Sequence, residues 1–172
     1  YRTTDAYVWE LTAYHIDPGF NYSGMCEGIA ERLTSEHVVR VLCLGDGVGD
    51  LTLHLWRLGF DSVYHDLRGS VTERFASFRF SEQTTRPQSC SLTDGWDAGE
   101  IVPPEDRRYH AVVSLDFLEH VTRVDEWIKA IYDSLDHGGI FVAQNAFGIG
   151  SGDNGSMPMH LARNDRYEKE WD

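Results

Sequence analysis

The apolar residues of this chain follow two patterns that alternate along its length. Short, nearly continuous apolar runs are typical of parallel strands buried on both faces. Such runs predict strands at 38–44, 62–65, 111–115 and 140–143, with a weaker one at 89–92. Apolar residues three or four positions apart predict helices at 49–58, 69–79 and 124–135. This alternation predicts an α/β domain in three layers, with a parallel sheet and right-handed crossovers.

The same spacing predicts which helical side chains face the sheet. The expected inward positions are Leu51, Leu55 and Leu58 in the first of these helices, Val71, Phe75 and Phe78 in the second, and Trp127, Ile128, Ile131 and Leu135 in the third. Gly59 should end the first helix, and the pair Gly138–Gly139 should end the third.

Two more helices are predicted before the first strand, at 5–14 and 23–34, with Asp5 placed to cap the first of them. Aromatic residues crowd this region, and they either pack on the sheet or form a lid over a cofactor and substrate. They are Tyr7, Trp9, Tyr14, Phe20 and Tyr22. We therefore divide the chain into an N-terminal helical lid or cap (1–35), an α/β core (36–147) and a flexible tail with a short helix (148–172).

The overall composition limits the classes of function. The chain has 172 residues, 41% of them hydrophobic, which suits one globular domain. Its net charge of −13 repels phosphate backbones, so we expect no nucleic-acid partner. We see no apolar run of about 18 residues and no signal peptide, so we expect a cytoplasmic protein with no membrane partner. The three cysteines match no zinc pattern.

Residues 41–50 carry the strongest functional signal. They read VLCLGDGVGD, a buried strand that runs into a glycine-rich turn before a helix, and the next strand ends at Asp66, 21 positions after Gly45. Glycines let the backbone approach a ligand closely, and a carboxylate at the neighbouring strand end accepts hydrogen bonds from ribose hydroxyls. The arrangement predicts a nucleotide-like cofactor.

The glycine spacing helps to separate two classes of cofactor. A dinucleotide site has a third glycine three positions after the second, so that the pyrophosphate reaches the helix N-terminus. Here the glycines are Gly45, Gly47 and Gly49, and Asp50 stands at the start of the helix. A carboxylate at that place should repel a diphosphate more than a cationic or zwitterionic ligand.

The stretch at 41–50 resembles the first motif of class I S-adenosylmethionine-dependent methyltransferases. The sequence YHAVVSLDFLEHV at 109–121 is similar to the fourth strand and following turn of this family, and SLDHGGIFV at 134–142 is similar to its LKPGGxLxxx strand. The resemblance covers about residues 38–146. It implies a three-layer, Rossmann-like methyltransferase fold with a mostly parallel sheet, without the last two strands of the complete sheet.

The resemblance also implies contacts with the cofactor. Gly45, Gly47 and Gly49 would pass beneath its methionine and ribose, and Asp66 would hold the ribose diol through charge-assisted hydrogen bonds. The other implied contacts are Leu67 against the adenine, Asp94 on its amino group, Trp96 as a wall, and Leu115 with Asp116 at the methyl-transfer cavity. The family usually carries an acid where this chain has Cys43, and Asp46 is the candidate substitute. As a mid-strand residue, Cys43 itself should be a small buried hydrophobe.

Methyl transfer needs little beyond in-line placement of donor and acceptor in a dry cavity. Where the acceptor must lose a proton, His120 is the candidate base, with Asp116 beside the reacting groups. His120 could instead only bond the backbone at a helix start. Asp116, Glu119 and His120 also form a D-x-x-E-H run that could hold a divalent cation, with His160 as a further ligand. Because LEHV is common in family members without a metal, we assign no metal ligand.

We therefore expect a methyltransferase that moves a methyl group from S-adenosyl-L-methionine to an oxygen or nitrogen atom of a small molecule and releases S-adenosyl-L-homocysteine. A non-catalytic S-adenosylmethionine-binding or regulatory domain of the same fold is an alternative, because of Cys43 and the missing strands. An NAD(P)-dependent dehydrogenase is a second alternative, against which Asp50 argues.

Overall fold

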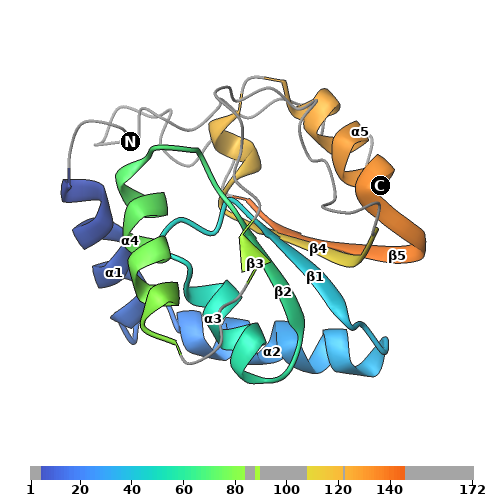
Figure 1. Ribbon diagram of the computed structural model, residues 1–172, viewed down its shortest axis with the longest axis horizontal. Helices are drawn as coiled ribbons and strands as arrows, with labels where there is room; N and C mark the ends of the chain where they lie inside the picture. The colour runs from blue at the N-terminus through green and yellow to red at the C-terminus, as the bar shows by residue number, and fades with distance from the viewer. Residues whose placement is uncertain (1–4, 84–87, 90–107, 122, 146–172) are drawn as a thin grey trace.

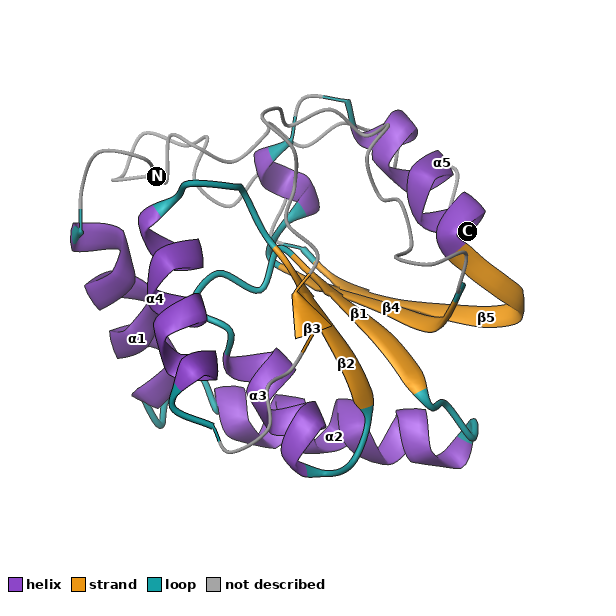
Figure 2. Cartoon of the chain, viewed as in Figure 1, coloured by secondary structure: helices purple, strands orange, loops and turns teal. Residues whose placement is uncertain are grey.

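The computed structural model describes residues 5–83, 88–89, 108–121 and 123–145. In this part of the chain five strands form one parallel sheet in the order β3-β2-β1-β4-β5 (Figures 1 and 2). They are β1 (Arg40–Leu44), β2 (Asp61–His65), β3 (Gln88–Ser89), β4 (Tyr109–Leu115) and β5 (Leu135–Gln144). The direction in which strands are added reverses between β1 and β4. Open α/β sheets bind ligands beyond the carboxyl ends of the strands at such a point.

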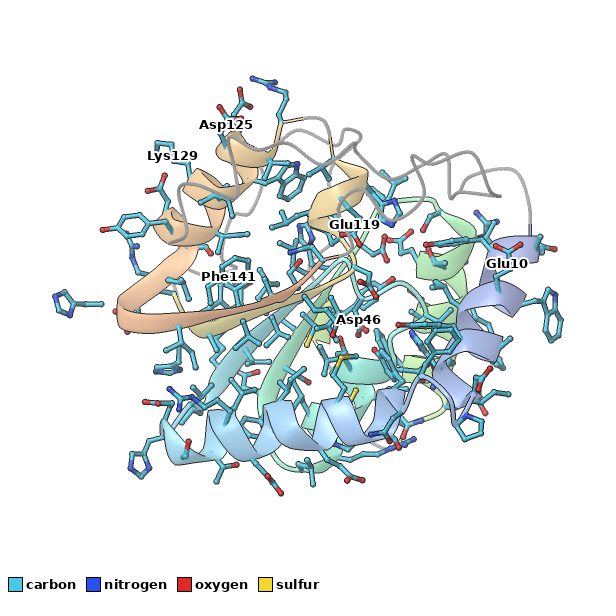
Figure 3. All side chains as sticks on the ribbon, turned by 180° about the vertical axis from the view of Figure 1, so that it is seen from behind. Glu10, Asp46, Glu119, Asp125, Lys129 and Phe141 are labelled. Atoms are coloured by element: carbon cyan, nitrogen blue, oxygen red, sulfur yellow. The ribbon has the colours of Figure 1, made fainter. Side chains whose placement is uncertain are left out.

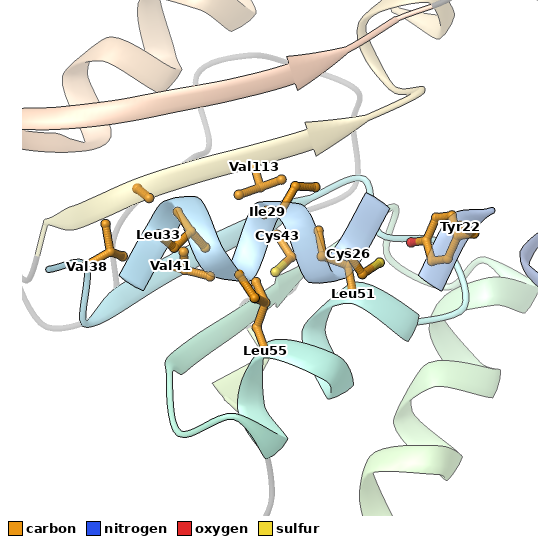
Figure 4. Close-up of a cluster of buried hydrophobic side chains, with 12 residues drawn as sticks. Tyr22, Cys26, Ile29, Leu33, Val38, Val41, Cys43, Leu51, Leu55 and Val113 are labelled. Carbon is orange, nitrogen blue, oxygen red and sulfur yellow. The ribbon is translucent and has the colours of Figure 1, made fainter. Parts of the chain in front are cut away.

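Helices cover both faces of this sheet. They are α1 (Ala6–Ile16), α2 (Tyr22–Ser35), α3 (Asp50–Arg57), α4 (Val71–Ser81), α5 (Val124–Ser134) and the short 3-10 helix η3 (Leu118–His120). Successive strand residues point to opposite faces. Val41 and Cys43 therefore pack with α2 and α3 (Figure 4), whereas Leu42 and Leu44 pack with Trp127 of α5. This confirms the predicted three-layer α/β fold, and Cys43 is fully buried as expected.

The boundary between α5 and β5 differs from the prediction. β5 begins at Leu135, directly after α5, so Gly138–Gly139 lie within a strand and do not end a helix. Tyr109 pairs with Leu135 and Ala111 with Ile140, so the extra residues of β5 bulge out of the ladder, and Gly138 has a φ of 78° there. The pairing with β4 extends the strand past the glycines, and local sequence does not reveal that pairing.

Two helical side chains that were predicted to face the sheet are exposed. Leu58 is 58% exposed because α3 ends before it, and Gly59 follows with a φ of 94°. Phe78 is 60% exposed because α4 instead turns Ala76 and Phe80 inward. Other predicted inward positions are confirmed as buried: Leu51, Leu55, Val71, Trp127 and Ile131.

The N-terminal region forms the two predicted helices, α1 and α2, joined by a short turn. Asp5 precedes α1, but its side chain makes no capping hydrogen bond, so the predicted cap is wrong. Of the aromatic residues, Tyr22 is buried, whereas Trp9 and Phe20 are 73% and 58% exposed. Tyr22 therefore packs against the core, whereas Trp9 and Phe20 remain on the surface.

Some predictions fall outside the described residues, namely the tail at 148–172 and most of the weak strand at 89–92. Within the described residues, no helix combines the length and the apolar character that crossing a bilayer requires.

Candidate cofactor site

The glycine-rich loop (residues 45–49) leaves the carboxyl end of β1 and enters α3. Gly45, Gly47 and Gly49 all have positive φ, between 48° and 81°, which glycine adopts at little cost. Each glycine is also closely covered by a neighbouring side chain. A Cβ atom at Gly45 would lie 2.4 Å from the Phe117 ring, and one at Gly47 would lie 2.8 Å from Leu11. Both backbone conformation and packing therefore require glycines in this loop.

Asp46 of this loop caps α3. Its carboxylate accepts hydrogen bonds from the Leu51 N–H at 3.2 Å, from the Thr52 N–H at 2.8 Å and from the Thr52 hydroxyl at 2.5 Å. Burial raises the pKa of Asp46 to about 6, and the Thr52 bonds oppose that rise. In this structure Asp46 satisfies helix N–H groups, so its predicted role toward the cofactor stays a prediction.

Replacing Asp46 with alanine should lower the free energy of unfolding by about 0.5–2 kcal/mol, because N–H groups at the start of α3 lose their acceptor. Urea denaturation followed by circular dichroism measures this change. Asp46→Asn keeps a capping oxygen and should lose much less. Equal losses in both variants would contradict the capping role.

Asp66 follows the last residue of β2 and lies beside the loop. Its carboxylate accepts a hydrogen bond from the Leu67 N–H at 2.5 Å, and the nearby Gly47 N–H also acts to lower its pKa. The Tyr64 hydroxyl donates to the Gly47 carbonyl at 2.7 Å, and the Gly45 N–H donates to the His65 carbonyl at 2.8 Å. The structure therefore brings together the loop and the acid that the sequence predicted would meet.

Burial dominates the electrostatics of Asp66, which is 9% exposed. It raises the pKa of Asp66 to about 7, and the two backbone N–H groups only partly offset it, while nearby Asp46 and Glu73 raise it further. Near neutral pH this carboxyl therefore exchanges readily between its charged and neutral forms.

Leu67, Leu115 and Asp116 lie at the same edge of the sheet. Leu67 is buried and Leu115 is half-buried as the last residue of β4. Asp116 has an unusual positive φ of 50°, and its N–H donates to the Gln144 carbonyl at 2.8 Å. The two remaining predicted contacts, Asp94 and Trp96, lie outside the described residues.

The candidate catalytic segment follows β4 as η3. Glu119 is fully buried, and the His120 N–H donates to the Phe117 carbonyl at 3.0 Å. Asp46 and Glu119 both lie in the region where the strands end (Figure 3). Burial, together with the charges of Asp116 and Glu119, raises the pKa of Tyr14 of α1. Among the described residues, no group of three acidic, histidine or cysteine side chains could hold a metal ion; His160 lies outside them.

Asp50 takes part in contacts that sequence reasoning missed. Its Oδ2 lies 2.6 Å from Nδ1 of His15, and its Oδ1 accepts from Arg79 at 2.5 Å. Burial would raise the pKa of Asp50, but the His15 hydrogen bond and the Arg79 guanidinium outweigh it and hold the pKa below its ordinary value. Because Arg79 offsets its charge, Asp50 repels a diphosphate less than the sequence argument assumed. No local signal in the sequence links positions 15, 50 and 79.

His65 is a second feature that the sequence did not single out. It is fully buried at the end of β2, 6.3 Å from the Trp127 ring centre, and burial lowers its pKa to about 3. Its ring is therefore neutral, and neither ring nitrogen has a hydrogen-bond partner in the described structure.

Comparison with known proteins supports the fold. No protein-family model and no curated protein matches the chain, but solved structures do. A methyltransferase dependent on S-adenosylmethionine from Clostridium acetobutylicum is 18% identical with a TM-score of 0.69, over 87% of this chain and 64% of that one. The sugar N-methyltransferase KedS8 from Streptoalloteichus sp. is 16% identical with a TM-score of 0.64, over 86% of this chain and 57% of that one. The glycopeptide N-methyltransferase MtfA bound to S-adenosylmethionine is 20% identical with a TM-score of 0.52, over 66% of this chain and 51% of that one.

These likenesses establish the fold: the chain has the Rossmann-like fold of S-adenosylmethionine-dependent methyltransferases. The chain spans less than two thirds of the length of each of these neighbours.

Proposed function

We propose that this chain binds S-adenosyl-L-methionine and transfers its methyl group to an oxygen or nitrogen atom of a small molecule. One observation carries the proposal. The Asp66 carboxylate, which accepts from the Leu67 N–H, lies beside the glycine-rich loop at the carboxyl edge of β1 and β2, where the Tyr64 hydroxyl and the His65 carbonyl bond that loop. A ribose diol can replace such a backbone partner while the glycines allow the rest of the nucleoside close to the chain.

Charge at the site supports a cationic cofactor over a dinucleotide. Four acidic residues lie at the strand ends, namely Asp46, Asp66, Asp116 and Glu119. The charges of Asp116 and Glu119 raise the pKa of Tyr14, and the charge of Asp46 raises the pKa of Asp66. A positively charged sulfonium is attracted by such carboxylates, and a diphosphate is repelled. This argument replaces the one from Asp50, whose charge is paired.

In this proposal each residue of the site has its own role in binding or transfer. Asp66 holds the ribose, the glycine-rich loop lies under the methionine, and Leu67 covers the adenine. Bound S-adenosylmethionine supplies the activated methyl group. Leu115 and Asp116 border the acceptor, and His120 accepts a proton where the acceptor must lose one. KedS8 is named a sugar N-methyltransferase and MtfA a glycopeptide N-methyltransferase, so an amine-bearing acceptor is the first to test.

A non-catalytic domain that binds the same cofactor is the second candidate, and one observation favours it. The Cys43 side chain is fully buried, and the Asp46 carboxylate is hydrogen-bonded to Thr52 of α3. Neither residue is therefore placed to hold the ammonium group of the cofactor's methionine in this structure.

Calorimetric titration tests the proposal. S-adenosylhomocysteine should bind, and NADH should not bind at the same concentrations. Methyl transfer from labelled S-adenosylmethionine to any member of a panel of amines and alcohols would establish the enzyme, whereas binding without transfer would favour the non-catalytic domain. Binding of NADH alone would overturn the proposal.

A further inference from the structure

One face of α1 lies against the glycine-rich loop. Val8 is the only buried residue of α1, and it shares a cluster with Val48 of the loop. Leu11 lies against Gly47, and His15 bonds Asp50. These three residues are spaced three and four positions apart, so they form a single helix face. α1 therefore covers the place where the cofactor is proposed to lie.

The contact between His15 and Asp50 is better shielded than a surface ion pair. The two side chains are 10% and 27% exposed. The His15 ring stacks on the Tyr22 ring, with ring centres 3.7 Å apart and planes 12° apart, which fixes its orientation. On the other side of Asp50, Arg79 also donates to the Val48 carbonyl at 2.6 Å, so α4 is tied to the same loop. Asp50 thus joins α1, α4 and the loop at one point.

Leu11 and Tyr14 of α1 are partly buried against the core, but few side chains of this helix are fully buried. One buried residue is few for a helix of 11 residues, whereas α2 has five. Trp9 and Ile16 on the outer side of α1 are more than 70% exposed. Segments with few buried apolar contacts open locally at low cost in free energy. The turn at Asp17, whose side chain accepts from the Gly19 N–H at 2.7 Å, connects α1 to α2 and can serve as the hinge.

We propose that the Asp50 carboxylate is a latch, which holds α1 closed over the glycine-rich loop through His15, and that the cofactor enters and leaves when His15 separates from Asp50. This inference rests on the proposed cofactor site. It makes Asp50 and His15 positioning residues that set the rate of cofactor exchange. Leu11 covers Gly47 on one side, so α1 must move aside for a ligand to reach or leave the loop, and the latch determines how often this happens.

Cofactor release is the first test. In His15→Ala the dissociation rate of S-adenosylhomocysteine, measured by stopped-flow fluorescence, should rise about tenfold, the lower end for losing a hydrogen bond to a charged group. Trp9→Ala, on the outer side of the same helix, should leave the rate unchanged. His15→Asn, whose amide can donate to Asp50, should restore most of the wild-type rate. Equal rates in wild type and His15→Ala would overturn the latch.

Hydrogen exchange in the free protein is the second test. Amides of residues 6–16 should exchange faster in His15→Ala than in wild type, while those of β1 and β4 should not change. This measurement needs no cofactor, so it separates the latch from the cofactor site. If wild-type protein binds no S-adenosylhomocysteine, the proposed function fails. If it binds but exchange in α1 is the same in both proteins, only the latch fails.

A reversible crosslink gives the strongest test of gating. Val8 and Val71 share a buried cluster, so the double variant Val8→Cys and Val71→Cys places two thiols there, and a disulfide that forms between them on oxidation would pin α1 to α4. S-adenosylhomocysteine bound before oxidation should be trapped, and ligand added afterwards should be excluded until a reductant is added. Unhindered exchange in the oxidised protein would overturn the proposal.

Discussion

Replacing Asp66 with alanine should weaken S-adenosylhomocysteine binding by about 1.5–3 kcal/mol, which is roughly 10- to 150-fold in the dissociation constant. The reason is that two ribose hydroxyls lose a buried, charge-assisted acceptor. Asp66 is 9% exposed as a residue, so water replaces the lost bonds only poorly. Isothermal titration calorimetry of wild type and variant measures the change.

A matched control comes from the other end of the same strand. Asp61 opens β2 at the amino edge of the sheet, where it lies 3.6 Å from Arg40. Asp61→Ala removes the same charge from the same strand and should leave the affinity within about twofold. An unchanged dissociation constant in Asp66→Ala would refute the assignment of Asp66 to the ribose.

Cofactor affinity should increase with pH up to about 7, because the ribose hydroxyls bind the charged form of Asp66 better. Burial raises the pKa of Asp66 from 3.8 to about 7 in the free protein. Below that value, binding must first remove a proton, so the dissociation constant should improve by up to about tenfold for each pH unit gained. Between pH 5 and pH 7 the dissociation constant should improve by about a hundredfold in total, and above pH 7 it should no longer change with pH.

Asp66→Asn is the control for this pH dependence. The amide can still bond a hydroxyl but does not titrate, so its affinity should vary much less between pH 5 and 7. A wild-type affinity that is flat over this range would contradict a raised pKa at Asp66.

The same pKa has an opposite effect on the stability of the free protein. A carboxyl whose pKa is raised on folding favours the folded state most below its unfolded pKa, and it loses that contribution as the pH rises through the folded pKa. For Asp66 the loss should occur between about pH 4 and pH 7. Asp66→Asn should remove this part of the pH dependence of urea denaturation.

Much of the fold could be predicted because local patterns of apolar residues indicate its strands and helices. Continuous apolar runs give the strands, and apolar spacing of three or four gives the helices. The meeting of the glycine-rich loop with Asp66 also followed, since parallel strands place their carboxyl ends at one edge of the sheet. The Tyr64 hydroxyl and the His65 carbonyl bond this loop directly before Asp66.

The errors have a common cause, which is that long-range packing overrides local signals. The glycine pair after Leu135 resembles a helix stop, but pairing with β4 makes it part of a strand. Phe78 has the right spacing to be buried, but the orientation of α4 buries Phe80 in its place.

The order of elements, the three-layer architecture and the position of the candidate cofactor site follow from the amino-acid sequence alone, because each depends on spacing along the chain or on the direction of parallel strands. The contacts of the charged side chains at that site depend instead on how the helices pack in three dimensions. Asp46 caps α3, and Asp50 meets His15 and Arg79. These partners lie on different helices, and their contacts depend on how the helices pack rather than on any pattern that neighbouring residues carry.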